Sequence, residues 1–193
     1  MALDELVAVL QRERELLDQL RFRFIETRLL LAAREVRYLG WATAEAEQAR
    51  RRARETDLVR AAAVQRWGSA GVRTGVPTLR ELATAVGGPV AGILRDHHDG
   101  LCTTVSEIEV IGHRNAELAR AGIRELADQA ESVPTMAARA SPAAASVALS
   151  LPDARELLED GMDLTALATE GAYQEVITLA GRLRMPALLA FLR

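Results

Sequence analysis

The sequence predicts an all-α protein, and three observations carry this prediction. Alanine, leucine, glutamate and arginine are abundant among the 193 residues, and all four favour helices. Aromatic residues make up only 4%, whereas sheets are rich in aromatic and β-branched side chains. Apolar residues recur at spacings of three and four, the period of a helix with one buried face. We expect an antiparallel bundle of long, coiled-coil-like helices over residues 1–131, with an additional C-terminal amphipathic helix docked on it.

The composition narrows the class of protein. Hydrophobic residues make up 49% and charged residues 26%, which is typical of soluble globular proteins. The net charge of −3 provides no general attraction to nucleic acid or to an anionic membrane. A single cysteine, Cys102, excludes an internal disulfide and fits a reducing compartment. Without a leader-like segment or a run of 18 apolar residues, we expect a cytoplasmic protein with no membrane insertion.

The first helix is expected over residues 3–39. No proline or glycine interrupts this stretch before Gly40, which we expect to end the helix. Glu13 and Thr27 occupy two gaps in an otherwise apolar series. That series alternates steps of three and four and predicts a seam against another long helix, formed by Leu6, Leu10, Leu17, Leu20, Phe24 and Leu31.

A second helix is expected over residues 42–67, before the sequence Gly-Ser-Ala-Gly at 68–71. Its buried face is rich in alanine, which permits close helix approach but buries little area per residue. We expect this face to consist of Ala42, Ala46, Ala49, Ala53, Val59, Ala63 and Trp67.

Two further helices are expected before residue 132. Thr78 and Glu81 form the pattern of a capping box, which predicts the start of a short helix that ends at 87–89. A long helix over 90–131 follows. The polar members of its seam are of the kind that sets register or partner choice. The full series is Leu94, His97, Leu101, Thr104, Ile108, Ile111, Asn115, Leu118 and Gly122.

The composition changes over residues 133–151, which are rich in Ala, Ser and Pro and predict a flexible linker. Beyond it, we expect Gly161 to stop a short helix and Asp163 to cap a second one that continues to about Arg184, before Pro186. So short a piece cannot bury its own apolar face. The chain is therefore divided into 1–132, 133–151 and 152–193, with the last piece packed on the first.

We expect the last piece to pack through its apolar stripe. The stripe consists of Leu164, Leu167, Ala168, Tyr173, Val176, Ile177, Ala180, Leu183, Leu188, Leu189 and Phe191. The candidate receiving residues are Leu94, Leu101, Val105, Ile108 and Ile111. These either receive the last helix or form the core of the first piece itself. A plain fourth helix of a single bundle predicts the same packing.

Catalytic and metal chemistry are not indicated. His98 and Cys102 are four residues apart on one helix face, but a stable metal site needs a third and a fourth ligand. Apart from His97 and His98, the sequence has only His113, which is about four turns further along the same helix. The basic run at 50–54 stands among acidic residues, which favours a solvated helix face over a nucleic-acid contact. We expect a binding protein that is not an enzyme, with no catalytic residue, no metal, no cofactor and no nucleic-acid partner.

The first piece carries three patterns: Leu6-x3-Leu10-Gln-Arg-Glu-Arg-Glu-Leu-Leu17, Glu26-Thr-Arg-Leu-Leu-Leu-Ala-Ala33, and Thr104-x3-Ile108-x6-Asn115-x2-Leu118. With these, residues 1–132 resemble the FlgN family of flagellar type III export chaperones. The resemblance implies a small cytoplasmic helical chaperone. Such proteins hold hook–filament junction proteins soluble and deliver them to the flagellar export apparatus.

The last piece carries Asp163-Leu164, Ala172-Tyr173-Gln174 and Pro186-x-Leu188-Leu189-x-Phe191-Leu192-Arg193. It resembles the carboxyl terminus of a hook–filament junction protein of the FlgL type, the segment that this chaperone class is understood to bind. Together the two resemblances imply a fusion of a chaperone with its client segment, joined within 141–150. The alternative is a coiled-coil structural or regulatory protein that self-associates through its seams.

Overall fold

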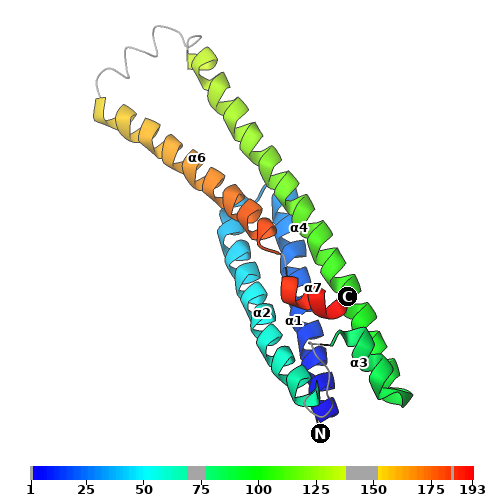
Figure 1. Ribbon diagram of the computed structural model, residues 1–193. Coiled ribbons are helices and arrows are strands. Elements are labelled where there is room, and N and C mark those ends of the chain that lie inside the picture. The colour runs from blue at the N-terminus through cyan, green and yellow to red at the C-terminus, as the bar shows by residue number, and fades with distance from the viewer. Residues whose placement is uncertain (1, 69–76, 138–151, 184) are drawn as a thin grey trace.

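The computed structural model describes residues 2–68, 77–137, 152–183 and 185–193, and these ranges contain helices and no strand. The all-α prediction is confirmed (Figure 1). The long helices are α1 (Ala2–Ala32), α2 (Leu39–Gly68), α4 (Gly88–Ala137) and α6 (Pro152–Gly181). The shorter elements are the 3-10 turn η1 (Val36–Tyr38), α3 (Leu79–Val86) and α7 (Pro186–Leu192).

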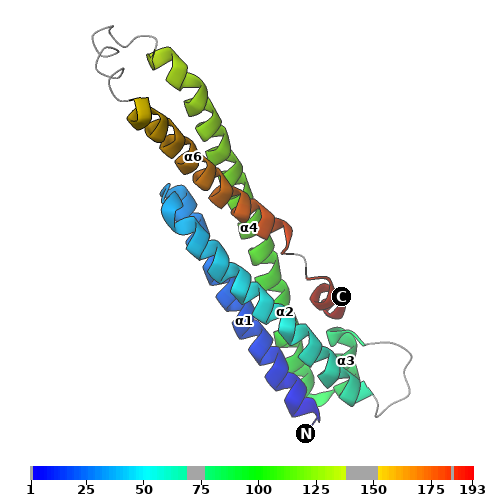
Figure 2. The same cartoon turned by 90° about the vertical axis from the view of Figure 1, so that its left-hand side faces the viewer.

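The long helices run alternately up and down the molecule. α1 packs on α2 and α4, and α6 returns along α4 while also contacting α2 (Figures 1 and 2). α7 lies beyond the end of α6, between α6 and the end of the molecule where α1 begins, and contacts α3 and α4 (Figures 1 and 2). α4 and the first part of α6 extend past the η1 corner between α1 and α2. The predicted antiparallel bundle is therefore present.

The seam predicted for the first helix is buried throughout, including its two polar positions. Glu13 and Thr27 are both almost fully buried. Asn115 of α4 is buried as well, and its Nδ2 donates to the backbone carbonyl of Phe24 in α1 at 2.8 Å. This hydrogen bond ties the register of α4 to that of α1. The apolar members of the α1 seam are Leu6, Leu10, Leu17, Leu20, Phe24 and Leu31.

The first helix ends earlier than predicted, and Gly40 does not end it. α1 stops at Ala32, and Arg34 adopts a left-handed conformation with φ of 59°. The amide of Glu35 donates to the carbonyl of Leu30 at 2.9 Å, and the amide of Arg34 donates to that of Leu31 at 3.2 Å. This pattern is a Schellman motif, with arginine in the position usually held by glycine. Gly40 lies instead in the first turn of α2.

The capping box is confirmed at α3. The Thr78 side chain accepts from the Glu81 amide, and the Glu81 carboxylate accepts from the Thr78 amide at 2.8 Å. Gly87 and Gly88 have positive φ values of 65° and 59°, so the chain reverses here and α4 begins at Gly88. α4 continues to Ala137, past the predicted end at residue 131.

The linker and the last piece also differ from prediction. Residues 133–137 belong to α4, and 138–151 lie outside the described residues. α6 runs without interruption through Gly161, since one interior glycine costs a long helix only about 1 kcal/mol. α6 ends at Gly181, and Pro186 begins α7 instead of ending a helix. Proline suits this first helical position because the amide there has no partner within the helix.

Two large apolar residues predicted to be in the core lie on the outside. Val59 of α2 is 51% exposed, and Leu118 of α4 is 39% exposed. In α2 the corresponding buried positions belong to Thr56 and Arg60. The other residues of the predicted α2 face are at least partly buried: Ala42, Ala46, Ala49, Ala53, Ala63 and Trp67.

Candidate helix-binding groove

The described helices before residue 138 are here called the body, and the described residues from 152 onward are called the tail. The tail packs against the body, and the surface of the body that it covers is here called the groove. The tail runs antiparallel to α4 through α6 and then crosses toward α3 as α7 (Figures 1 and 2). Its apolar side chains enter the same two hydrophobic clusters as those of the body. The groove is thus lined by side chains from several body helices.

The upper part of the groove holds the first turns of α6 whose side chains are described. Tyr173 and Val176 are buried against Leu31, Leu39 and Ala119. Burial raises the pKa of the Tyr173 hydroxyl, and the nearby Glu125 carboxylate raises it further. The ring therefore stays neutral at the interface.

The lower part of the groove holds the end of α6 and all of α7. These residues share one continuous core with α1, α2, α3 and α4. From the tail this core contains Leu179, Leu183, Met185, Leu188, Phe191 and Leu192. From the candidate receiving residues it contains Leu94, Leu101, Val105 and Ile108, with Ile111 partly buried against them. From the sequence, these residues are expected either to receive the last helix or to form the core of the first piece. They do both, because the core that they form includes residues of the tail.

The remaining predicted tail residues divide into three groups. Ile177, Ala180 and Leu189 are partly buried. Ala168 is exposed, so its placement in the packing stripe is wrong. The side chains of Leu164 and Leu167 lie outside those described. The described residues of the stripe are therefore at least partly buried from Tyr173 onward, where α6 runs beside the α1–α2 hairpin.

His98 of α4 anchors the end of the tail. Its Nε2 lies 2.9 Å from the backbone carbonyl oxygen of Leu192, and its Nδ1 lies 2.8 Å from Asp99 Oδ1. The ring is buried. A helix C-terminus has backbone carbonyls without partners inside the helix. His98 supplies one such partner to α7, and this contact is independent of the tail's side chains.

A buried charged cluster lies beside this anchor. The Arg60 guanidinium stacks over the Phe191 ring, 4.9 Å from its centroid, and pairs with Glu13 and with Asp57, the latter at 2.6 Å. Burial raises the pKa of Glu13, and the Arg60 charge opposes that rise. Oε2 of Glu13 has no hydrogen-bond partner. The cluster therefore joins α1, α2 and α7 at one point in the core.

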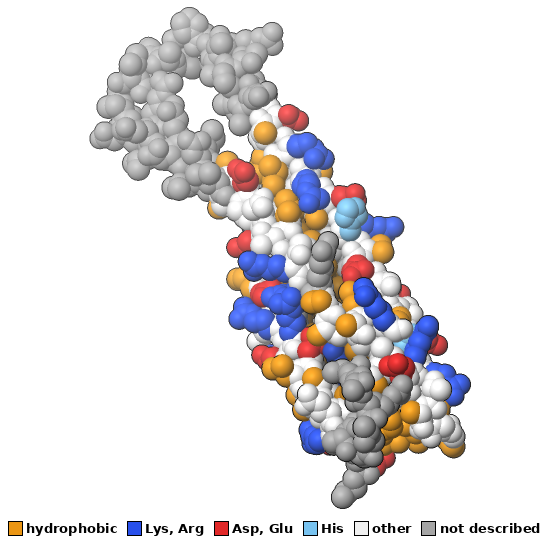
Figure 3. Space-filling model, in the orientation of Figure 1, with side chains coloured by type: hydrophobic (Ala, Val, Ile, Leu, Met, Phe, Trp, Pro, Cys, Tyr) orange, Lys and Arg blue, Asp and Glu red, His pale blue; other side chains and the backbone are white. Residues whose placement is uncertain are grey.

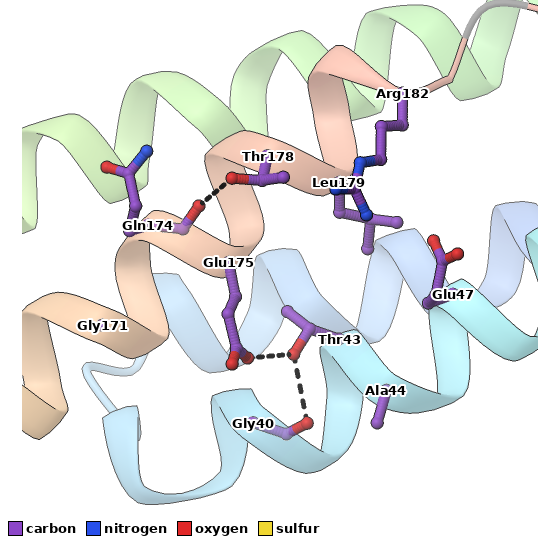
Figure 4. Close-up of a pocket in the computed structure, with 10 residues that line it drawn as sticks. All are labelled: Gly40, Thr43, Ala44, Glu47, Gly171, Gln174, Glu175, Thr178, Leu179 and Arg182. Carbon is purple, nitrogen blue, oxygen red and sulfur yellow. Dashed lines mark hydrogen bonds between the residues drawn. The ribbon is translucent and has the colours of Figure 1, made fainter.

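A polar rim closes the groove between α2 and α6. The Thr43 hydroxyl donates to Glu175 Oε2 at 3.0 Å, as Figure 4 shows. An open pocket of about 550 Å³ surrounds this contact. Arg182 faces the same pocket, and its charge adds to that of Arg50 in lowering the pKa of Glu47. Apolar contacts therefore line the floor of the groove and polar contacts its edge.

Among the described residues, no group of three or more His, Cys, Asp or Glu side chains is placed to hold a metal ion. The histidine–cysteine pair noted in the sequence has another arrangement: Cys102 Sγ lies 3.8 Å from the Nε2 of His98, which is directed at the tail. Burial raises the pKa of the Cys102 thiol, which disfavours the thiolate that reactive chemistry requires.

The basic run at 50–54 is less solvated than expected, because Arg50 is buried. Its Nε and one terminal nitrogen lie 2.7 and 2.6 Å from the two carboxylate oxygens of Glu47.

None of the described helices has the length and apolarity needed to cross a membrane.

Sequence reasoning missed several residues of the groove. Arg60 and His98 are polar, so a search for large apolar residues passes over them. It also passes over Gly112 of α4, whose backbone lies against the Leu183 side chain of the tail. The signal for Arg60 was its place in the three-four series of α2, seven residues from Ala53 and three from Ala63.

The chain matches no family model, no curated protein and no solved structure.

Proposed function

We propose that the protein is a flagellar export chaperone of the FlgN type that shields the C-terminal helix of a hook–filament junction protein, with that client segment carried on the same chain. The single observation that supports this function best is the burial of the tail's apolar stripe in the body's own core. Such a stripe, left in water, promotes aggregation. A groove that covers it keeps the segment soluble.

The contact belongs to the helix-in-groove class of recognition. An amphipathic helix lays its apolar face into a groove between helices, and large side chains at helical spacing act as anchors. Here the anchors are Tyr173 and Val176 on α6, Leu183 just beyond the end of α6, and Phe191 on α7. Aromatic anchors that fill a pocket typically provide most of the binding energy.

The charges around the groove fit a protein partner. On the face drawn in Figure 3, arginine and acidic side chains are interspersed, without a continuous basic stripe. Nucleic-acid binding depends mainly on neutralising phosphates, which requires such a stripe. We therefore propose a cytoplasmic protein whose partners are junction-protein C-termini and the flagellar export apparatus, and which acts without a cofactor.

Cleavage of the full chain tests whether the tail behaves as a ligand. A protease site placed within 138–151 is cut after folding, and the product is passed over a size-exclusion column at decreasing concentration. We expect the two fragments to co-elute, because the buried stripe holds them together. Uncut protein is the control. Separation of the fragments at micromolar concentration contradicts the proposal.

Self-association is the second candidate function, and exposed apolar side chains favour it. Trp41 and Leu58 of α2 are 74% and 77% exposed, and Phe22 and Leu29 of α1 are also exposed. These residues lie outside the tail's groove. Contiguous exposed apolar patches mark interaction sites, whereas single exposed apolar residues are normal on soluble proteins. Self-association through α1 and α2 therefore requires that these side chains act together as one patch.

A further inference from the structure

Two glycines of α4 lie where tail side chains approach its backbone. A Cβ atom built on Gly112 would lie 2.2 Å from Leu183 Cδ1. A Cβ atom on Gly122 would lie 2.4 Å from Tyr173 Cζ and 2.8 Å from both neighbouring ring carbons. Real Cβ atoms do not approach other atoms this closely. Each glycine is thus a notch that one tail side chain fills.

Gly100 of α4 also has a close neighbour, since a Cβ atom there would lie 2.6 Å from the end of the Arg14 side chain, which belongs to α1 and not to the tail. Other helical glycines lie in open space. A Cβ atom at Gly92, also in α4, or at Gly171 in α6 would meet nothing within 4 Å. Glycine in a helix interior costs about 1 kcal/mol relative to alanine. At Gly112 and Gly122 this cost is retained where tail side chains fill the space that a Cβ atom would occupy.

The spacing of the notches matches that of the side chains. Gly112 and Gly122 are ten residues apart, and so are Tyr173 of α6 and Leu183, which lies two residues beyond the end of α6. α6 runs antiparallel to α4 (Figure 1), so Tyr173 meets Gly122 and Leu183 meets Gly112. A shift of one residue moves a helix by about 1.5 Å and turns it by about 100°. Such a shift places Tyr173 and Leu183 against positions that bear a Cβ atom.

We propose that Gly112 and Gly122 make the groove selective for one register. It admits an amphipathic helix that carries a tyrosine, a leucine ten residues later and just beyond the end of that helix, and then a short apolar helix whose carbonyl end meets His98. This inference rests on the proposed function, since it defines which client helices the groove accepts. His98 contacts a backbone carbonyl, which every peptide has, so this contact does not distinguish one client sequence from another. The notches at Gly112 and Gly122 do, because each accepts a particular side chain at a particular position.

Competition by peptides tests the selection. The full chain, cut within 138–151, is loaded with a labelled peptide of residues 152–193, which unlabelled peptides then displace. One competitor is unchanged; a second has an alanine inserted after Thr178, between the two anchors. The matched control has the same insertion after Ala168, which leaves the spacing of ten intact. We expect the peptide altered between the anchors to compete about tenfold more weakly and the control to compete like the unchanged peptide.

Equal competition by all three peptides overturns the register inference while leaving helix binding intact. If no peptide binds, the proposed function fails, and the uncut chain then decides the register inference. There Gly112→Ala should lower the Tm by about 5 °C, whereas Gly92→Ala should not lower it. Adding Gly112→Ala to Leu183→Ala should cause no further loss, because the clash has been removed. Fully additive losses would overturn the pairing of Gly112 with Leu183.

Discussion

At the scale of single residues, the polar positions of the core carry as much information as the apolar ones. Glu13 stands in a gap of the α1 seam and Arg60 in a gap of the α2 seam, and the two side chains meet. Arg60 also contacts Phe191 of the tail. A buried ion pair adds little net stability, but removing one partner leaves a charge without compensation. The two partners are therefore not equivalent to mutation.

Arg60→Met should be far more damaging than Glu13→Gln. The first change leaves Glu13 buried without a counter-charge, which typically costs about 3–5 kcal/mol of unfolding free energy. The second leaves Arg60 paired with Asp57. Urea unfolding of both variants at pH 7 measures the difference. Equal losses would contradict this assignment.

The stability of the protein should also depend on pH through Glu13. Its pKa is raised in the folded state by burial. The stability that such a group contributes is fully present below its unfolded pKa of about 4.3 and is lost as pH rises through the folded pKa. The glutamine in the Glu13→Gln variant cannot ionise, so the variant does not lose stability at this position as pH rises. We expect the unfolding free energy of Glu13→Gln, relative to wild type, to increase as pH rises from 4 to 7; a constant or falling difference contradicts the shift.

Leu183 and Ala168 belong to the same predicted apolar stripe of the tail, but Leu183 is buried and Ala168 is exposed. Leu183→Asp places a charge in the core and should lower the unfolding free energy by at least about 3 kcal/mol. Ala168→Asp is the matched control, because Ala168 belongs to the same predicted stripe but is exposed. Proteolysis of the tail measures both effects. Equal protease resistance in the two variants would mean that the wrong face is assigned to the groove.

Core positions could be predicted from the sequence where they are large and apolar. The α1 seam and most of the candidate receiving residues are buried, because leucine spacing alone specifies such a face. Val59 and Leu118 are exposed, and the next residue along the chain, Arg60 or Ala119, is buried in each case, so the inward position belongs to a charged or small side chain. The close approach of Leu183 to α4 requires a residue without a side chain at Gly112, and only the tail reveals that need.

At the scale of elements, the ends of the helices depend on backbone conformation more than on residue type. Arg34 ends α1 in a left-handed conformation, although glycine is the usual residue there. Glycines that usually stop helices lie inside α2 and α6, at Gly40 and Gly161. Packing of the neighbouring turns offsets the cost of one glycine, so the predicted breaks do not occur. The capping box at Thr78 is confirmed, because it satisfies specific amides, and the predicted ends of α2 near Gly68 and of α3 at Gly87 are confirmed as well.

The end of α1 can be tested by paired substitutions at Arg34. Arg34→Gly and Arg34→Ala both remove the exposed contact to Glu125. Only glycine relieves the left-handed strain, which costs other residues about 1–2 kcal/mol. We expect the glycine variant to be more stable than the alanine variant by about 1 kcal/mol in thermal or urea unfolding. An alanine variant of equal stability would show that the strain is absent.

At the scale of the whole molecule, the tail completes a bundle that the body begins. Both hydrophobic clusters include residues from the tail, so α6 and α7 cover surface that the body would otherwise expose. This arrangement fits a groove that needs an occupant, as a chaperone groove does. A protein built for self-association would instead use its outer faces, where Trp41 and Leu58 lie.

Light scattering on the full chain separates these two functions. With its groove filled, the protein should be a monomer of 21.0 kDa at all concentrations, because the apolar stripe of the tail is already covered by the body. Replacing Trp41 and Leu58 with Ser should then leave the measured mass unchanged. A concentration-dependent oligomer that these replacements dissociate would favour the self-associating alternative.

Displacement of the tail by a client is the most direct test of the proposed function. The full chain is cut within 138–151, its tail fragment is labelled, and a peptide of equal length from the C-terminus of a flagellar hook–filament junction protein is added. A scrambled peptide of the same composition is the control. We expect the junction-protein peptide to release the labelled tail, with an affinity within about tenfold of the tail's own. Release of the tail by both peptides, or by neither, would contradict a groove that recognises the junction-protein C-terminus.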